Sequence, residues 1–216
     1  DSTTQKSIRY GVTNGLTNEV VYNVLPDGDD WIWLSTNHGL SRLNLKAKKF
    51  KNFDTMDGLI NGEFTNGAGL HLSNGTFMFG GTSGVDYFNS KNIKKNTFIP
   101  PVSITAVYVD NKEVLLPKKD TDKLVLEYDQ NVFSFDFIAL SYAQPTKNKY
   151  AYKLDGFDTS WNHIGNSTSA TYTNLDAGAY TFRVKASNND AVWNEEGVAI
   201  GVIVFPAPWK TWWAYI

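Results

Sequence analysis

The chain has 216 residues, enough for two small domains, and a formal net charge of −2 from 20 basic and 22 acidic residues. Because the charges are balanced and form no long basic block, a nucleic-acid partner is not expected. The absence of cysteine excludes a disulfide scaffold, a zinc–thiolate centre and a cysteine nucleophile. Aromatic residues make up 14% of the chain and glycine occurs 17 times, which favours sheets joined by tight turns.

The first half of the chain contains an internal repeat. The segment NGLTN at residues 14–18 reappears as DGLIN at residues 57–61, which is 43 positions later. The segment TNHGL at residues 36–40 reappears as GTSGV at residues 81–85, which is 45 positions later. A repeat of about 40–45 residues built from strands and turns has the length of a four-stranded propeller blade. We therefore expect residues 1–99 to form about two carboxy-terminal blades of a β-propeller.

The expected strands follow this repeat in chain order. The first copy divides into strands at residues 20–25, 31–35, 40–45 and 50–53. The second copy gives strands at residues 65–72, 76–79 and 85–88, and no clear fourth strand before Pro100-Pro101. Two blades cannot close a ring, and residues 7–10 resemble the outer strand of a preceding blade. We therefore expect the chain to be an excerpt of a longer protein, with an unknown number of blades upstream.

Beyond Pro100-Pro101 the repeat stops and a strict alternation of apolar and polar residues begins. The apolar positions of this alternation are Val102, Ile104, Leu124, Leu126, Tyr128, Phe133, Phe135, Phe137, Tyr150, Tyr152, Leu154, Tyr180, Phe182, Val184, Ala186, Ile200, Val202 and Val204. A period of two with one polar face is typical of half-buried antiparallel strands. Residues 100–208 are therefore predicted to form an Ig/fibronectin-like antiparallel β-sandwich, and the whole chain an all-β protein.

The order of motifs in the first copy resembles a known repeat. Residues 14–18 are followed by a strand, by Asp27-Gly28, by Trp31-Ile32-Trp33 and by the TNHGL segment. This order is similar to that of the two-component regulator propeller repeat, which fills the periplasmic sensors of hybrid two-component systems, chiefly of gut Bacteroidetes. The second copy departs from the pattern, with Phe77-Met78-Phe79 in the place of the tryptophans. Such a departure is expected of a terminal blade.

The second half carries its own resemblance. Residues 150–158 with Trp161, and residues 172–188, are similar to the hallmarks of the Y_Y_Y domain, which follows regulator propellers and precedes a membrane span. The resemblance implies the periplasmic part of an inner-membrane protein, with a histidine kinase domain elsewhere in the full protein. The aromatic residues 209–216 then form a juxtamembrane tail, and a membrane span is expected just after Ile216.

No pattern of catalytic chemistry is visible. The three histidines, His38, His71 and His163, have no partner at a metal-ligand spacing. The adjacent pair Glu195 and Glu196 would point to opposite sides of an extended strand and cannot flank one bond. No phosphate-binding, dinucleotide-binding or serine-nucleophile motif occurs. We therefore expect no catalytic residue, no metal and no cofactor, and this region is not expected to be an enzyme.

A ligand, if this region binds one, is expected where the blade loops meet. In a four-stranded blade, the loop that enters the first strand and the loop between the second and third strands lie on one face. The two copies would therefore bring together Asn18, Glu19, Asn37, His38, Asn61, Glu63, Thr82 and Ser83. These side chains donate and accept hydrogen bonds, as sugar hydroxyls and carboxylates require. The alternative is that they cap turns and hold the blades together.

The expected function follows from these resemblances. The chain is expected to be a sensor fragment of a hybrid two-component histidine kinase and response regulator. Its sandwich would form a homodimer and relay the binding of an oligosaccharide, bound by the intact sensor, to the membrane span. The alternative is a carbohydrate-binding or adhesive accessory module of a secreted multidomain protein. An apolar span of roughly 20 residues after Ile216 would favour the sensor.

Overall fold

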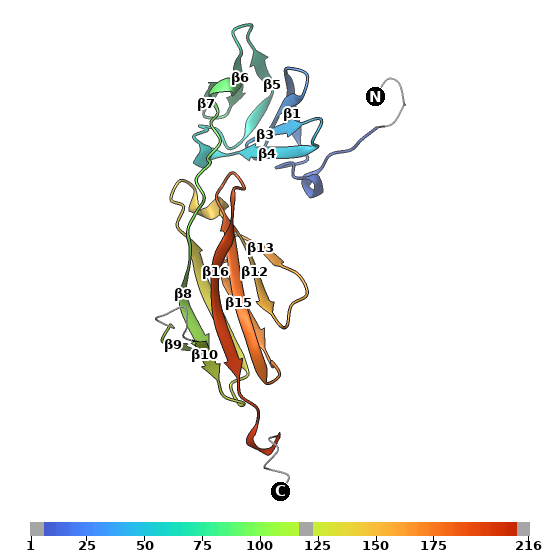
Figure 1. Cartoon of the computed structure of the whole chain (residues 1–216). Helices are drawn as coiled ribbons and strands as arrows, with labels where there is room; N and C mark the ends of the chain where they lie inside the picture. Colours follow the sequence, from blue (N-terminus) through green and yellow to red (C-terminus); the bar gives the residue numbers. More distant parts are fainter. Residues whose placement is uncertain (1–6, 117–122, 211–216) are drawn as a thin grey trace. The chain divides into compact units, whose positions relative to one another are not determined.

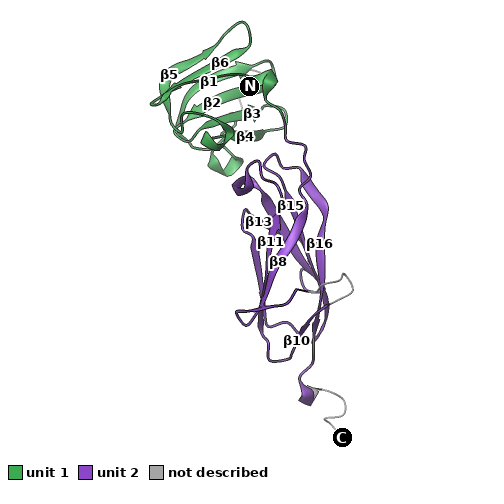
Figure 2. Cartoon of the chain, turned by 90° about the vertical axis from the view of Figure 1, so that its left-hand side faces the viewer, with its two compact units in different colours: residues 1–94 green, residues 95–216 purple. Residues whose placement is uncertain are grey.

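The computed structural model describes residues 7–116 and 123–210. The chain divides into two compact units, residues 1–94 and residues 95–216 (Figures 1 and 2). Each unit contains two β-sheets, and the described residues include short 3₁₀ turns but no α-helix. The predicted all-β fold class is therefore confirmed.

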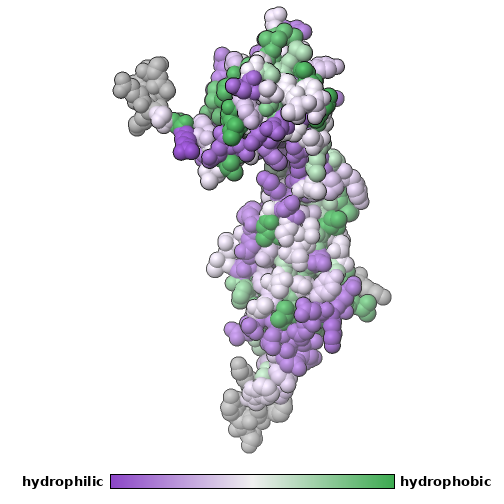
Figure 3. All heavy atoms as spheres, turned by 180° about the vertical axis from the view of Figure 1, so that it is seen from behind, coloured by the Kyte–Doolittle hydropathy of each residue, from purple (hydrophilic) through white to green (hydrophobic). Residues whose placement is uncertain are grey.

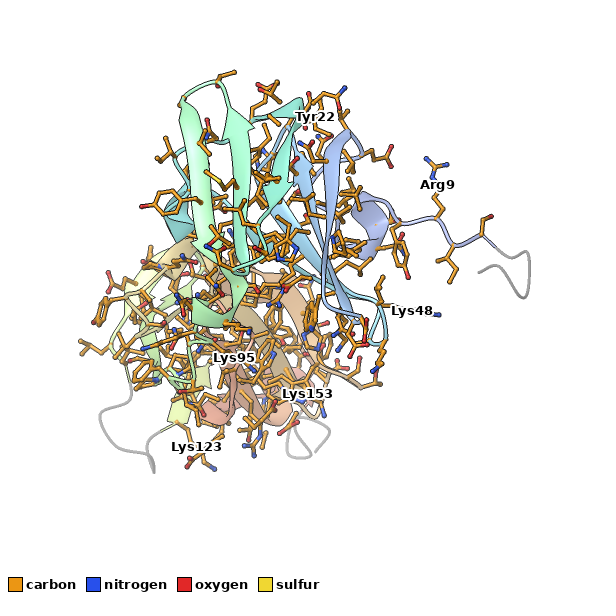
Figure 4. The ribbon with its side chains drawn as sticks, turned by 90° about the horizontal axis from the view of Figure 1, so that it is seen from above. Arg9, Tyr22, Lys48, Lys95, Lys123 and Lys153 are labelled. Atoms are coloured by element: carbon orange, nitrogen blue, oxygen red, sulfur yellow. The ribbon has the colours of Figure 1, made fainter. Side chains whose placement is uncertain are left out.

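Unit 1 consists of two antiparallel meanders, as expected for two consecutive propeller blades. Blade 1 contains β1 (Val21–Asp27), β2 (Trp31–Thr36), β3 (Leu40–Asn44) and β4 (Lys49–Phe53) in sheet order. Blade 2 contains β5 (Phe64–His71), β6 (Thr76–Gly81) and β7 (Gly84–Asn89), and no fourth strand pairs with β7 among the described residues. Seen from above, the two sheets stand side by side, with Tyr22 of β1 near the place where they meet (Figure 4).

Each blade is preceded by the same turn, which explains the sequence repeat. The 3₁₀ turns η1 (Val12–Asn14) and η2 (Thr55–Asp57) both end at a glycine in the left-handed conformation. Gly15 has φ of 105° and Gly58 has φ of 97°. A side chain is strained at such angles, so the glycine of both copies is required by the turn.

The residues beside these glycines also have repeated roles. The side chain of Asn14 accepts a hydrogen bond from the Gly11 amide, and that of Asp57 accepts one from the Asp54 amide. Leu16 is buried against the first blade, and Leu59 packs into the core between the blades. The repeated Asn/Asp-Gly-Leu triplet therefore encodes a capped turn that places a leucine in a hydrophobic core.

The largest core of unit 1 lies between the two blades. Trp33 of β2 is fully buried there, with ring centroids 5.2 Å from Phe53 and 4.7 Å from Phe88. Phe77 and Phe79 of β6 approach the same cluster from blade 2. Trp33 is therefore a core residue rather than a surface platform for a sugar.

Unit 2 is a β-sandwich of a five-stranded and a four-stranded sheet. The five-stranded sheet has the order β10 (Lys123–Leu126), β16 (Trp193–Val204), β15 (Gly178–Ser187), β12 (Lys149–Asp155) and β13 (Asn162–Gly165). The four-stranded sheet has the order β14 (Ser169–Thr173), β11 (Val132–Ala139), β8 (Val102–Val109) and β9 (Lys112–Val114). Phe135 of one sheet stacks on Phe182 of the other, with ring centroids 4.0 Å apart. The predicted sandwich is confirmed.

One strand pairing differs from the antiparallel arrangement predicted for the sandwich. Strand β10 runs parallel to β16, from the pair Lys123–Gly201 to the pair Leu126–Val204. The chain reaches β10 after leaving the opposite sheet at β9. Because no hairpin joins β10 to its neighbour, no tight turn imposes an antiparallel direction.

The division between the units lies five residues before the expected boundary at 99 and 100. The reason is a group of hydrogen bonds within unit 2. The side-chain amide of Asn188 donates to the carbonyl oxygens of Asn96 and Phe98 at 2.9 and 2.7 Å. The segment before Pro100 is thereby fastened to unit 2, although it has no alternation that would reveal this in the sequence.

The carboxy-terminal end is described as far as the 3₁₀ turn η5 (Pro208–Lys210). The ring of Trp209 meets that of Tyr128 edge to face, with centroids 5.2 Å apart. The rest of the predicted juxtamembrane tail, residues 211–216, lies outside the described residues. Within the described part of the chain, no helix is both long and apolar enough to cross a membrane.

Candidate functional site

The loops that enter the blades lie against the turns between the second and third strands, as the sequence predicted. In blade 1, the Thr17 hydroxyl is 3.1 Å from the Thr36 hydroxyl and 3.0 Å from the Ser41 hydroxyl. Ser41 Oγ also accepts a hydrogen bond from the Thr17 amide at 3.3 Å. These contacts join the entry loop of blade 1 to the ends of β2 and β3.

In blade 2 the same junction is built around Asn61, which is almost completely buried. Its side-chain amide donates to the Asp86 carboxylate at 2.8 Å and to the Gly84 carbonyl oxygen at 3.1 Å. Its side-chain oxygen accepts a hydrogen bond from the Ser83 amide at 2.8 Å. The Asp86 carboxylate also accepts from the Ile60 amide at 2.7 Å. Asn61 therefore holds the two loops of blade 2 together rather than facing solvent.

The two blades are connected along the same loops. The Gly39 amide, in the turn between β2 and β3, donates to the Gly62 carbonyl oxygen in the entry loop of blade 2 at 2.7 Å. Asn23 of β1 also donates to the Thr65 carbonyl oxygen of β5 at 2.9 Å. A continuous set of loops results, which we call the loop rim: Asn18, Glu19, Asn37, His38, Asn61, Glu63, Thr82 and Ser83.

Members of the loop rim differ in how accessible they are. Glu19, His38, Glu63, Thr82 and Ser83 are exposed, whereas Asn18 and Asn37 are half-buried. The Asn18 side-chain oxygen accepts a hydrogen bond from the Val20 amide at 2.8 Å and so caps its own loop.

Asn37 differs from the other residues of the loop rim in the state of one side-chain atom. Its side-chain oxygen Oδ1 is buried and has no hydrogen-bond partner in the described part of the chain. A buried polar atom without a partner costs free energy unless a ligand or water satisfies it. The exposed His38 imidazole follows directly in the same turn.

Two features of the rim were not singled out from the sequence. Asp86 and Thr17 hold the loops in place, and Asp86 is a buried carboxylate within a strand. An acidic residue at a strand position is a recognisable signal, because carboxylates are rarely buried without partners. Among the described residues, no group of three or more histidine or carboxylate side chains is arranged to hold a metal ion.

The tyrosines of residues 150–158 and 172–188 belong to the framework of unit 2. The Tyr150 hydroxyl accepts a hydrogen bond from the Ala139 amide at 3.1 Å, and the Tyr180 hydroxyl donates to the Asp176 carbonyl oxygen at 2.9 Å. The Tyr172 hydroxyl donates to the Asp158 carboxylate at 2.5 Å. Burial and the nearby Asp158 carboxylate raise the pKa of Tyr172 well above its ordinary value.

A second polar cluster holds the start of unit 2, and we call it the asparagine latch: Asn96, Asn188, Asn189, Asp190 and Asn194. Besides the Asn188 bonds to residues 96 and 98, the Asn96 amide donates to the Asp190 carboxylate at 2.6 Å. The Asn194 side chain donates to the Pro100 carbonyl oxygen at 3.0 Å. The latch joins the first residues of unit 2 to the turn from which β16 begins.

The comparisons with known proteins agree with this architecture. Residues 141–205 match the Y_Y_Y domain family. Over 211 residues, the chain is 37% identical to histidine kinase P4 of Formosa agariphila. This match covers 94% of this chain and 15% of that protein.

A solved structure is similar over both units. The extracellular domain of the putative hybrid two component system BT3049 from B. thetaiotaomicron matches with a TM-score of 0.78 and 26% identity. The match covers 95% of this chain and 29% of that chain. The extracellular domain of the hybrid system BT4673 from the same organism also aligns, with 26% identity, a TM-score of 0.46 and coverage of 94% of this chain and 27% of that chain.

Residues 141–205 thus match the Y_Y_Y domain family, and the chain resembles the extracellular domain of a hybrid two-component system. The resemblance stated from the repeat and from the tyrosine motifs is confirmed. The chain spans less than a third of the length of either of the first relatives it matches. The region itself resembles a non-catalytic sensor domain.

Proposed function

We propose that the chain is the membrane-proximal part of the periplasmic sensor of a hybrid two-component histidine kinase in the inner membrane. The observation that carries this proposal is the likeness to the extracellular domain of such a system over 95% of the chain, across both units. In this proposal the propeller binds an oligosaccharide, and the sandwich relays the bound state toward the membrane.

The loop rim supports a polar ligand such as an oligosaccharide. Exposed hydrogen-bonding side chains from two blades, among them His38 and Glu63, lie along loops that are joined by the Gly39–Gly62 hydrogen bond. The unpaired Oδ1 of Asn37 offers an acceptor for a sugar hydroxyl. Further blades of the intact propeller would complete the binding surface.

The relay is supported by the asparagine latch and by β16. The latch fixes residues 96–100 to the turn at the start of β16, and this strand extends from Trp193 to Val204 with one β-bulge against β15, between Asn194 and Val198. A displacement at the start of unit 2 would therefore be carried along β16 to the carboxy-terminal end of the sandwich.

A homodimer through the sandwich belongs to the same proposal. At one end of the sandwich, where β10 lies beside the end of β16, four apolar side chains are exposed: Val125, Tyr128, Phe205 and Trp209. Apolar side chains grouped at a surface favour association. Signal transfer then requires that the ligand binds two arrangements of the dimer with different affinities.

The test is calorimetric titration of the complete extracytoplasmic region with a panel of purified oligosaccharides. Saturable heat is expected for at least one sugar. Loss of one or two hydrogen bonds to a charged group at the rim costs about 1.5–3 kcal/mol of binding free energy. The double variant His38→Ala/Glu63→Gln should therefore weaken sugar binding roughly tenfold or more. Glu113→Gln, an exposed substitution on β9, serves as the matched control.

Each outcome decides between the alternatives. Absence of heat across a broad panel would oppose sugar sensing and favour an adhesive or accessory module. Binding that is unchanged by the rim substitutions would move the sugar site away from these blades. Binding with no effect of the sugar on autophosphorylation of the full-length protein would contradict the relay.

A further inference from the structure

The sheet register locates the two extra residues that change the repeat offset from 43 to 45 positions. From Val21 to Val24, β1 advances three residues while its partner β2 advances two. From Phe64 to Gly69, β5 advances five residues while its partner β6 again advances two. The extra residues of blade 2 therefore lie in an enlarged β-bulge, which we call the β5 bulge, at residues 65–68.

The β5 bulge leaves one asparagine both exposed and unrestrained. Thr65, Asn66 and Gly67 are exposed. Gly67 has φ of 73°, which glycine adopts without strain. Within the described part of the chain, no hydrogen bond holds the Asn66 side chain. Polar side chains are visible over the surface of unit 1 in Figure 3, and the Asn66 amide is one of those that water reaches.

Asn66 and Gly67 form one of four Asn-Gly pairs in the chain, and the others are at residues 14–15, 61–62 and 74–75. Asparagine is a thermolabile residue, because the backbone nitrogen of the next residue can attack its side-chain carbonyl carbon. Glycine in the next position hinders this attack least, since it has no Cβ. The four pairs are alike in sequence, so their surroundings in the folded chain decide which of them reacts.

The other three pairs are restrained by hydrogen bonds. The Gly15 amide donates to the Val12 carbonyl oxygen at 2.9 Å, and so the attacking nitrogen of that pair is engaged. The Gly75 amide is engaged in the same way by the Leu72 carbonyl oxygen at 2.9 Å. Asn61 is almost completely buried, and three hydrogen bonds fix its side chain. Only the pair in the β5 bulge has neither restraint among the described residues.

We propose that Asn66 is a site of spontaneous deamidation through a cyclic succinimide formed with Gly67. The Gly67 nitrogen bonds to the side-chain carbonyl carbon of Asn66, and the side-chain nitrogen leaves as ammonia with the proton of the Gly67 amide. Water then opens the ring at either carbonyl carbon and gives aspartate or isoaspartate. One water molecule is consumed and one ammonia is released, so the reaction needs no oxidant, reductant or enzyme.

The product alters blade 2 next to the loop rim. It adds a carboxylate three residues after Glu63. Isoaspartate also lengthens the main chain directly after Thr65, whose carbonyl oxygen accepts a hydrogen bond from Asn23 of blade 1. This modification is a property of the chain itself and does not depend on a sugar ligand.

The test is peptide mapping by mass spectrometry after incubation of the complete extracytoplasmic region in mildly alkaline buffer. Alkali favours loss of the attacking amide proton. The gain in mass from amide to acid should appear at Asn66 roughly tenfold faster or more than at the other three asparagines, which must first open their hydrogen bonds. The matched control is the same protein unfolded in urea, in which all four Asn-Gly pairs should react at similar rates.

A variant tests the route of the reaction. Gly67→Ala should slow the change at Asn66 severalfold, in the folded protein and in urea, because a Cβ hinders the attack. A Cβ on Gly67 would meet no atom within 4 Å, so the variant creates no steric conflict in the fold. The measurement in urea is independent of the left-handed conformation at this position.

Three results would overturn the proposal. The first is an unmodified Asn66 in the folded protein while the four pairs react in urea. The second is equal rates at the four asparagines in the folded protein, which would deny the β5 bulge any role. The third is an unchanged rate for Gly67→Ala in urea, which would exclude the succinimide route.

Discussion

Buried and half-buried polar side chains join segments of this protein that must be fixed to each other. Asn61 joins the loops of blade 2, and Asn188 joins the start of the sandwich to the turn before β16. Asp158 joins the turn after β12 to β14, because it accepts hydrogen bonds from the Leu154 amide and the Tyr172 hydroxyl. Each of these groups has partners for its buried oxygen or nitrogen atoms, as burial requires.

The Tyr172–Asp158 pair predicts a specific pH dependence. The folded state raises the pKa of Tyr172, whose ordinary value is 10.0, because of burial and the Asp158 carboxylate. Above pH 10 the unfolded chain loses this proton and the folded chain keeps it, so the free energy of unfolding should fall as pH rises. Urea unfolding at pH 7 and at about pH 11 should show a smaller fall for Tyr172→Phe than for the unaltered chain.

At pH 7 the same substitution should cost about 1–3 kcal/mol, because the Asp158 carboxylate loses a partner. Tyr142→Phe, at an exposed position, is the control and should keep the full pH dependence. An identical alkaline slope for Tyr172→Phe and the unaltered chain would rule out this pair as its source.

At the scale of elements, the blades are specified by short turns rather than by long patterns. Gly28 turns β1 into β2 with φ of 69°, and Gly39 turns β2 into β3 with φ of 82°. The two positions differ in their surroundings. A Cβ atom on Gly39 would lie 2.2 Å from the Phe53 carbonyl oxygen, whereas one on Gly28 would meet no atom within 4 Å.

Alanine substitution should therefore separate backbone strain from steric conflict. Gly28→Ala should cost about 1–2 kcal/mol, which is the strain of a left-handed residue. Gly39→Ala should cost about 3 kcal/mol or more, because β4 must also move and the Gly39–Gly62 hydrogen bond is disturbed. Urea unfolding of the two variants tests this, and equal losses would show that the Phe53 contact is relieved at no cost.

At the scale of the whole molecule, the chain consists of two units with separate hydrophobic cores. Phe79 belongs to the core between the blades, and Phe182 belongs to the core of the sandwich. Residues 141–205 of the sandwich match the Y_Y_Y domain family, and the blades precede the sandwich in the chain. The assignment of residues 1–99 to propeller blades of a larger ring and of residues 209–216 to a juxtamembrane tail stays a prediction.

Separate cores predict separate unfolding transitions. Phe79→Leu should lower the stability of unit 1 by about 1–2 kcal/mol, a fraction of the 3–5 kcal/mol expected for Phe→Ala, and leave unit 2 unchanged. Phe182→Leu should do the reverse. Differential scanning calorimetry of the chain measures both, and a single transition that both substitutions shift equally would show that the units unfold together.

The sequence by itself determined the architecture of this protein. The Asn/Asp-Gly-Leu turns, the 43- and 45-residue offsets and the alternation after Pro100-Pro101 are local signals, because turn conformation and side-chain periodicity depend on neighbouring residues. They located the seven strands of unit 1 within about two residues and predicted the sandwich. They also predicted that the blade-entry loops meet the turns between the second and third strands.

Other features were decided only by the tertiary structure, because they depend on residues far apart in sequence. The side chain of Asn188 draws residues 96–100 into unit 2, and β10 joins β16 in parallel after crossing between sheets. Asn61 was a candidate ligand contact by sequence, and its burial against Asp86 became visible only in the folded chain. Which atoms bury one another is set by long-range packing, and no local pattern encodes the partner of a buried amide.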